Sequence, residues 1–242
     1  MGSQDIRARI GNAMPAGLAV PLRHRFGPSR EREMELIGRF CPRGSTCVDV
    51  GANKGTWTYG MAKAVGPDGH VLALEPQPDL VAYLRKAFDS TRQVTIHSVA
   101  ASDSQGTVTL HVPTVDGRTE PGLASVDRTY ESSTEYEVAT NRLDDIVGDR
   151  DVAFIKIDVE GHELSVVTGA VSLLARSRPT LVIELTDIDE SSGSRRTYDL
   201  VTGDLGYRPH VYVSGHLTPI NRWPYWDVAR SAQPTPNVVF LP

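Results

Sequence analysis

Two segments of the chain carry residues whose types and spacing suit the binding of a small molecule. In the first, residues 47–58, Asp49 and Gly51 follow an apolar run that predicts the end of a buried strand, and Gly55 lies four residues beyond Gly51. This spacing lets the backbone turn tightly before a helix that begins near Thr56. The unpaired N–H groups at that helix start favour an electron-rich group, and Asp49 can accept hydrogen bonds from an ammonium. The segment therefore predicts a site for both ends of an amino acid.

An acidic residue, Glu75, follows the next predicted strand, where a carboxylate can hold the two hydroxyls of a ribose. Together the two positions predict a ligand made of an amino acid and a nucleoside, which is the composition of S-adenosylmethionine. A nicotinamide dinucleotide site also has an acid here, but its fingerprint requires three glycines in the order G-x-G-x-x-G. Gly51 and Gly55 are spaced G-x-x-x-G, with Asn53 in place of the second glycine. The pattern therefore favours the methyl donor over the nicotinamide.

The second segment, residues 154–163, places several charged side chains after another predicted buried strand. Asp158, Glu160, His162 and Glu163 follow the apolar residues of this strand. In open α/β sheets, ligands bind at the carboxyl ends of the strands. These side chains are therefore candidates to contact the reacting groups.

The elements that must position these segments alternate between strands and helices. Before residue 100, the sequence predicts strands near 46–50, 70–74 and 93–98 and helices near 56–65 and 78–88. After residue 150, it predicts strands near 152–158, 180–185, 208–213 and 237–241, helices near 163–174 and 195–204, and a Trp- and Pro-rich loop at 215–235. This order is typical of an α/β fold with a parallel sheet and crossover helices.

Two regions lie outside this alternation. Residues 1–35 are rich in arginine and broken by glycine and proline, and they predict an irregular N-terminal arm with two short helices, ahead of a domain at residues 36–242. Residues 106–140 contain short alternating runs separated by polar turns, and they predict an antiparallel β-rich insert. We expect the arm and residues 117–135 of the insert to act as a lid over the second substrate.

Several ordered motifs together resemble one enzyme family, the FkbM family of S-adenosylmethionine-dependent O-methyltransferases. The resemblance covers roughly residues 45–242 and is carried by residues 48–55, 75–76, 100–103, 140–145, 154–163 and 237–241. It implies a class I methyltransferase core, which is a Rossmann-like sheet of seven mostly parallel strands with the last one antiparallel. It also implies transfer of a methyl group to a hydroxyl, commonly on a sugar, polyketide or glycolipid.

The resemblance also implies roles for individual residues. The methionine half of the cofactor would lie against Asp49, Gly51, Asn53 and Gly55, with Thr58 touching it from the helix start. The ribose would be held by Glu75, the adenine would be flanked by Ser102 and Asp103, and the methyl group would face Asp158. The chain departs from the commonest family pattern at Ala101 and at His162.

An alcohol is a poor nucleophile at neutral pH, so the acceptor hydroxyl needs a base or a cation beside it. His162 lies just after Asp158 and Glu160, and an ordinary histidine pKa of about 6.5 suits a general base. Alternatively, Asp158 and Glu184 end strands that should be adjacent, with Asp187 just beyond, and these oxygens could hold Mg²⁺. The third possibility is that the protein only aligns the reactants, without a base or a cation beside the hydroxyl.

Some of these residues also fit purely structural roles. Asp103 suits an ordinary turn, and Glu160 and Glu163 suit the N-terminus of the helix that follows them. His162 also suits a surface position. Lys156 lies on the same face of its strand as the candidate aspartate, which favours a structural ion pair over a catalytic role.

The leading function is therefore methylation of a hydroxyl on a saccharide, glycolipid or related biosynthetic intermediate, so the partner is a small-molecule or oligosaccharide acceptor. The alternatives are a S-adenosylmethionine-binding protein without activity and, less favoured, a nicotinamide-dependent oxidoreductase. The aromatic residues of segment 223–226 suit stacking on a sugar face, but they equally suit the rim of the core or a contact in a homo-oligomer.

Composition limits the other partners. A formal net charge of −5 and a pI near 5.8 argue against nucleic acid, which attracts clustered positive charge. Cys41 and Cys47 give neither a disulfide framework nor a zinc pattern, which favours a reducing cytoplasm. The sequence contains no apolar run long enough for a transmembrane helix and no apolar signal core, so we expect a soluble, unexported protein.

Overall fold

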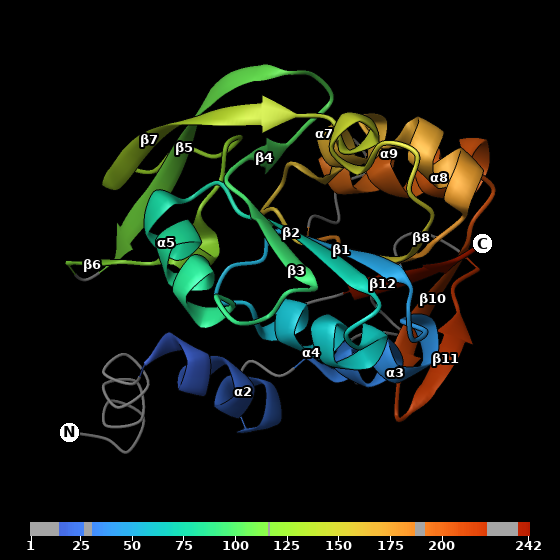
Figure 1. The fold of residues 1–242 in the computed structure, drawn as a ribbon. Helices are drawn as coiled ribbons and strands as arrows, with labels where there is room; N and C mark the ends of the chain where they lie inside the picture. Colours follow the sequence, from blue (N-terminus) through green and yellow to red (C-terminus); the bar gives the residue numbers. More distant parts are fainter. Residues whose placement is uncertain (1–14, 27–30, 116, 187–191, 222–236) are drawn as a thin grey trace.

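The computed structural model describes residues 15–26, 31–115, 117–186, 192–221 and 237–242, and its centre is one mixed sheet (Figure 1). The strands lie in the order β11-β10-β12-β9-β8-β1-β2-β3. Their bounds are β1 (Thr46–Val50), β2 (His70–Leu74), β3 (Val94–His97), β8 (Val152–Ile157), β9 (Thr180–Glu184), β10 (Arg208–Val213), β11 (His216–Pro219) and β12 (Asn237–Leu241).

The direction of the strands agrees with the sequence prediction. β3, β2, β1, β8 and β9 pair in parallel, and β12 runs antiparallel to both β9 and β10. The difference lies at the edge of the sheet. β11 was expected to be part of a loop, but it forms a hairpin with β10 across Ser214 and Gly215, and both turn residues have positive φ angles. Such a two-residue turn matches the twist of paired strands.

Successive side chains of a strand point to opposite faces of the sheet, and in these strands both sets are largely apolar. Helices therefore cover both faces. Cys47 of β1 belongs to a core cluster with Trp57 and Met61, whereas its neighbour Val48 belongs to a second cluster with Leu173. The lower layer consists of α2 (Ala16–Phe26), η1 (Arg32–Leu36), α3 (Ile37–Phe40), α4 (Thr56–Val65) and α5 (Pro78–Ala87). The upper layer contains α6 (Leu143–Val147), α7 (Glu163–Thr168), α8 (Val171–Ser177), α9 (Gly193–Asp199) and the π-helical turn η3 (Leu200–Asp204).

The single helix expected at residues 163–174 is in fact two helices, α7 and α8. Gly169 ends the first, and a Cβ atom at this position would lie only 1.9 Å from the carbonyl oxygen of Ser102. Asp144 then caps the second helix, since its Oδ1 accepts a hydrogen bond of 2.8 Å from the Leu173 N–H. The break therefore lets the turn after β4 (Ala100–Ala101) pack against the helix layer.

The insert is the expected antiparallel flap, built on the long strands β5 (Gly106–Val115) and β7 (Ser133–Asn141). The short strands β4 (Ala100–Ala101) and β6 (Arg118–Thr119) complete a second sheet in the order β4-β7-β5-β6, and the turn η2 (Pro121–Leu123) follows. Leu110, Val112 and Val138 give this sheet an apolar core of its own with Ala100. Because β4 directly follows β3, this core anchors the insert beside the main sheet.

The described part of the N-terminal arm packs closely on the domain. Val20 of α2 is buried in a cluster with Ala52, Leu84 and Phe88, and the Arg23 guanidinium donates a 2.6 Å hydrogen bond to the hydroxyl of Tyr83. The arm is thus partly helical and held by α4 and α5. Among the described residues, none of the helices is both long enough and apolar enough to cross a membrane.

Candidate active site

Strand register brings the predicted site residues to one place. Val50 is paired with Leu74 on one side and with Ile157 on the other, so the residues after these three strand ends meet at the same edge of the sheet. A pocket opens there. It is lined by Val50, Gly51, Asn53, Leu74, Glu75, Pro76, Val99, Ala100, Ala101, Leu110, Pro121, Gly122, Ala124, Val126, Asp158, Val159, Glu160 and His162.

Asp49 is buried at the end of β1, with 1% of its surface exposed. Its Oδ2 accepts a 2.5 Å hydrogen bond from the hydroxyl of Thr58, whereas its Oδ1 has no hydrogen-bond partner among the residues that the structure describes. Burial raises the pKa of Asp49 to about 6. Neither Asp49 nor the fully buried Thr58 lines the pocket, so both lie behind its wall, where Thr58 orients the Asp49 carboxylate.

The glycine-containing turn lets β1 and β8 approach closely. Gly51 has a φ of +78°, and a Cβ atom on it would lie 1.8 Å from the carbonyl oxygen of Asp158. Asn53 also adopts a left-handed conformation, with a φ of 47°, which is uncommon outside glycine. Gly55 packs under Leu84 and Phe88 of the lower helix layer, so it shapes the turn without lining the pocket.

Glu75 is held by two backbone N–H groups. Its Oε2 accepts a 2.8 Å hydrogen bond from the Asn53 N–H, and its Oε1 accepts one of 2.9 Å from the Gln77 N–H. Burial nonetheless raises the pKa of this carboxyl to about 7. The carboxylate is therefore fixed in direction and lines the pocket where a ribose is predicted.

Ser102 and Asp103, the two residues predicted beside adenine, differ in their surroundings. Ser102 is buried, and its Oγ lies 3.0 Å from His162 Nε2. The other ring nitrogen of His162, Nδ1, lies 2.7 Å from Oδ2 of Asp127 in the insert. Asp103 is exposed and accepts a 2.9 Å hydrogen bond from the Ser104 hydroxyl, as in an ordinary turn. The structure thus joins the turn after β4, the loop after β8 and the insert through one histidine.

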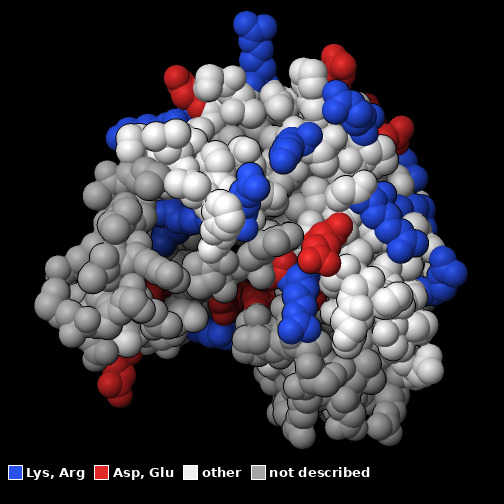
Figure 2. Space-filling model, turned by 90° about the horizontal axis from the view of Figure 1, so that it is seen from below, with Lys and Arg blue, Asp and Glu red and all other residues white. Residues whose placement is uncertain are grey.

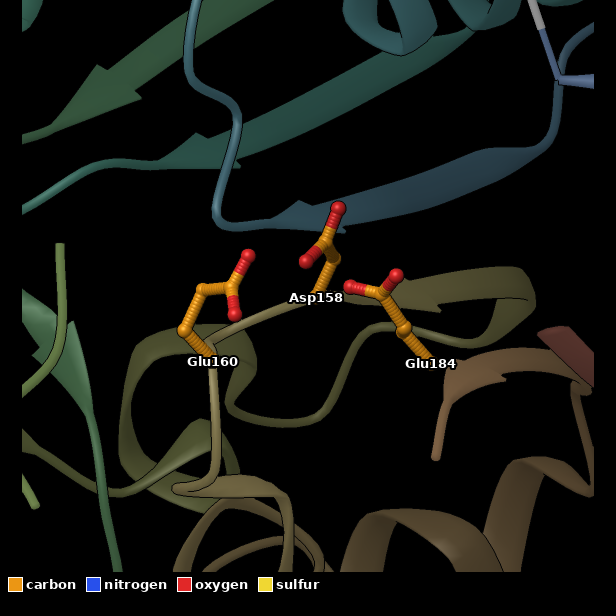
Figure 3. A group of neighbouring side chains, drawn as sticks. All are labelled: Asp158, Glu160 and Glu184. Carbon is orange, nitrogen blue, oxygen red and sulfur yellow. The ribbon is translucent and has the colours of Figure 1, made fainter. Parts of the chain in front are cut away.

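Three carboxyl groups point toward one another at the ends of β8 and β9 (Figure 3). Oxygens of Asp158, Glu160 and Glu184 all lie within 4.8 Å of one another. Burial, followed by the charge of Asp158, raises the pKa of Glu160 to about 7 and that of Glu184 to about 10. The raised pKa favours the protonated form of Glu184, which can donate a hydrogen bond to Asp158. Glu160 has a φ of 52°, a strained conformation that turns it toward this cluster.

Lys156 forms the ion pair that the sequence predicts. Its Nζ lies 2.5 Å from Asp158 Oδ2, and only 2% of its side chain is exposed. Burial alone would lower the pKa of Lys156, but the carboxylates of Asp158, Glu31 and Asp49 hold it above its ordinary value. Burial acts to raise the pKa of Asp158, and the Lys156 charge outweighs it, so that this pKa is lowered.

The insert supplies residues that sequence reasoning missed. Ser125 donates a 2.8 Å hydrogen bond to the carbonyl oxygen of Glu160, and Arg128 lies 3.4 Å from the Glu160 carboxylate. Asp127, between them, holds His162. Residues 125–128 belong to no strand or helix and carry no periodic pattern, so the only signal in the sequence was a polar stretch within the insert.

Two predictions fall on residues outside those that the structure describes. They are Asp187, proposed as a metal ligand, and the aromatic segment 223–226. The structure therefore adds Glu160 to the acidic group of Asp158 and Glu184, while the part of Asp187 stays a prediction.

The strand order and the acidic strand ends define a class. Sheet order β3-β2-β1-β8-β9-β12-β10 with β12 antiparallel is that of class I S-adenosylmethionine-dependent methyltransferases. A profile of the Methyltransferase FkbM domain matches residues 49–209. The chain belongs to the FkbM methyltransferase family, as its motifs predict.

Solved structures agree with the fold. Methyltransferase FkbM from Methylobacillus flagellatus KT is 18% identical with a TM-score of 0.50, and the match covers 96% of this chain and 57% of that one. The chain thus spans little more than half the length of that protein. An O-methyltransferase from Bacillus cereus in complex with SAH is 14% identical with a TM-score of 0.50, and the match covers 98% of this chain and 88% of that one. No curated protein matches the chain.

Proposed function

We propose that this methyltransferase transfers its methyl group to a hydroxyl of a saccharide, glycolipid or related biosynthetic intermediate. The observation that carries the proposal is that one pocket is lined by carboxylates from two strand ends. Glu75, which suits a nucleoside, follows β2, and Asp158 and Glu160 line the same pocket after β8. A hydroxyl can donate a hydrogen bond to such carboxylates. The similar protein from Bacillus cereus is also described as an O-methyltransferase.

The described residues fit S-adenosylmethionine. The unpaired Oδ1 of Asp49 is a buried acceptor without a donor, and the ammonium of a methionine would supply one. Glu75 would accept from the ribose hydroxyls, and the absent side chain at Gly51 leaves its backbone open beside the loop after β8. When bound, S-adenosylmethionine supplies a methyl group that is already activated by its sulfonium.

The protein's own contribution is to place and deprotonate the acceptor. Lys156 lowers the pKa of Asp158 and fixes its carboxylate, whose side chain is 29% exposed, so Asp158 can orient a hydroxyl by accepting its hydrogen bond. Glu160 lines the pocket beside it and has a pKa raised to about 7, close to the value that suits a general base at neutral pH. We propose Glu160 as the group that takes the hydroxyl proton.

His162 was predicted as the general base, but in the structure it could act as one only after a change in its hydrogen bonds. Both ring nitrogens already have partners, Ser102 and Asp127, so His162 would accept a proton from the acceptor only after one contact broke. We propose that it holds the loop carrying Glu160 against the insert.

Magnesium is the second candidate for activating the hydroxyl, and the cluster of Asp158, Glu160 and Glu184 is the observation that favours it. These oxygens are the ligand type that Mg²⁺ prefers. If a metal ion is required, EDTA abolishes turnover and Mg²⁺ restores it. Turnover that is unaffected by EDTA leaves the base as the activating group.

A saccharide acceptor is favoured over a nucleic acid by the charge of the molecule. The net charge is −5. On the face shown in Figure 2, Lys and Arg side chains are scattered among uncharged atoms, and acidic side chains lie within a hollow. Among the residues described on that face, a phosphate backbone would meet no continuous basic surface.

The test is mass spectrometry of products from a panel of sugar, glycolipid and polyketide hydroxyls. A mass gain of one methyl group on an oxygen, absent with Asp158→Asn, supports the proposal. Binding of S-adenosylmethionine with no product from any acceptor would instead favour the inactive binding protein. Binding of NADH in place of S-adenosylmethionine would favour the oxidoreductase.

A further inference from the structure

Lys156 is a buried cation directly beneath the open carboxylate of the site. Side chains alternate along β8, so Phe154, Lys156 and Asp158 share the lower face of the strand. The Lys156 side chain is 2% exposed and the Asp158 side chain 29% exposed, with 2.5 Å between Nζ and Oδ2. The ammonium therefore contacts the inner side of a carboxylate that also lines the pocket.

The surroundings of Lys156 hold its ammonium in place. The ring of Trp57 lies 5.7 Å from Nζ, within the range of a cation–π contact, and it stacks on Phe154 at 6.1 Å between centroids. The indole N–H of Trp57 donates a 3.0 Å hydrogen bond to Glu31, whose other oxygen accepts one of 3.0 Å from Asn237. The arm, α4, β8 and β12 thus all contribute to one enclosure.

We propose that the Lys156 ammonium supplies the positive charge that a divalent metal ion would otherwise supply at the acceptor end of the site. It neutralises the carboxylates there and positions Asp158 toward the acceptor hydroxyl. The inference rests on the proposed function and makes the transfer independent of metal. A second cation, the guanidinium of Arg128, lies 3.4 Å from the Glu160 carboxylate and completes the neutralisation.

Distances argue against a metal ion beside this lysine. Because Nζ is 2.5 Å from Asp158 Oδ2 and Mg²⁺ binds oxygen at about 2.1 Å, an ion on that oxygen would lie within about 4.6 Å of the ammonium. Like charges repel strongly at such a separation where water is largely excluded. The Lys156 side chain is only 2% exposed and contacts Asp158, so its charge would have to be neutralised or moved away before an ion could bind.

The test is a titration of the full-length protein with Mn²⁺, followed by electron paramagnetic resonance. We expect wild type to show no stoichiometric Mn²⁺ site. The same is expected of Lys156→Arg, which keeps the charge, and of Lys63→Met, which is a surface control. Lys156→Met removes the charge at similar length and is expected to bind Mn²⁺ about tenfold or more tightly than wild type. Adding Glu160→Gln to Lys156→Met should abolish that new site.

One tight Mn²⁺ site in wild type would overturn the proposal, and so would a folded Lys156→Met variant that binds Mn²⁺ no better than wild type. The wild-type titration is decisive even if Lys156→Met fails to fold. It requires neither donor nor acceptor, so it remains readable if the chain proves to bind no S-adenosylmethionine. With an acceptor in hand, Lys156→Met should lower kcat with little change in the affinity for SAH, and Lys156→Arg should restore part of kcat.

Discussion

The Nε2 atom of His162 lies 3.0 Å from the hydroxyl oxygen of Ser102, a residue 60 positions earlier in the chain. Together with the contact between His162 and Asp127, this hydrogen bond ties the turn beside the predicted adenine site to the insert. The histidine is therefore part of the wall of the pocket, and its removal should affect cofactor binding as well as turnover.

We expect His162→Ala to lower the free energy of unfolding by about 2 kcal/mol, because two hydrogen bonds of a buried side chain are lost at about 1 kcal/mol each. The affinity for SAH should fall with it. Thermal unfolding and calorimetry measure both effects, and His216→Ala on the exposed part of β11 is the control. If stability and SAH affinity were unchanged while turnover alone fell about a hundredfold, His162 would be the base.

Affinity for SAH should depend on pH through Glu75. Its pKa is raised to about 7 by burial, and a protonated carboxyl cannot accept from both ribose hydroxyls. Binding of SAH should therefore be about tenfold weaker at pH 6 than at pH 8, because the ionised fraction of a carboxyl with this pKa is about tenfold smaller at pH 6. Glu75→Gln should bind weakly at both pH values, whereas Glu137→Gln, on the exposed part of β7, should behave like wild type. If SAH binding to Glu75→Gln showed the same pH dependence as binding to wild type, a group other than Glu75 would be responsible.

Gly51→Ala should be far more damaging than Gly44→Ala. Both residues have nearly the same φ, +78° and +77°, so both substitutions carry a similar backbone strain of about 1 kcal/mol. Only at Gly51 would the new Cβ lie 1.8 Å from a backbone oxygen, that of Asp158, while at Gly44 nothing lies within 4 Å. Gly51→Ala should lose SAH binding, and Gly44→Ala should keep it with a small drop in Tm. Equal effects would show that the close contact between the two loops is unimportant.

Deletion of residues 1–30 tests whether the arm is a lid. Because it removes α2 with its buried Val20, we expect a lower Tm, and because it breaks the chain just before Glu31, the enclosure of Trp57 should loosen. Turnover should fall if the arm covers the acceptor. Unchanged turnover at a temperature where the truncated protein is folded would rule out the lid role, and deletion of residues 1–14 alone is the matched comparison.

Local patterns in the sequence were enough to predict that Gly51, Glu75 and Asp158 lie together at one pocket. Each follows an apolar strand, and parallel strands bring their carboxyl ends to one edge regardless of what the loops do. The pairing of Lys156 with Asp158 was predicted for a similar reason, because residues two apart on a strand share a face.

Other features depend on contacts between distant segments, which no local pattern reports. The break at Gly169 arises because the Ser102 carbonyl approaches it, and the partners of His162 come from the path of the insert at Asp127. The enclosure of Lys156 likewise needs Glu31 and Asn237, which lie 206 residues apart in the sequence.

The most direct test of the account is calorimetric titration of the purified protein with S-adenosylmethionine and, separately, with NADH. We predict one saturable site for S-adenosylmethionine, a marked loss of affinity in Asp49→Ala, whose carboxylate offers the unpaired Oδ1, and no binding of NADH. Saturable binding of NADH without binding of S-adenosylmethionine, or full affinity in Asp49→Ala, would contradict the assignment of this pocket to a sulfonium nucleoside.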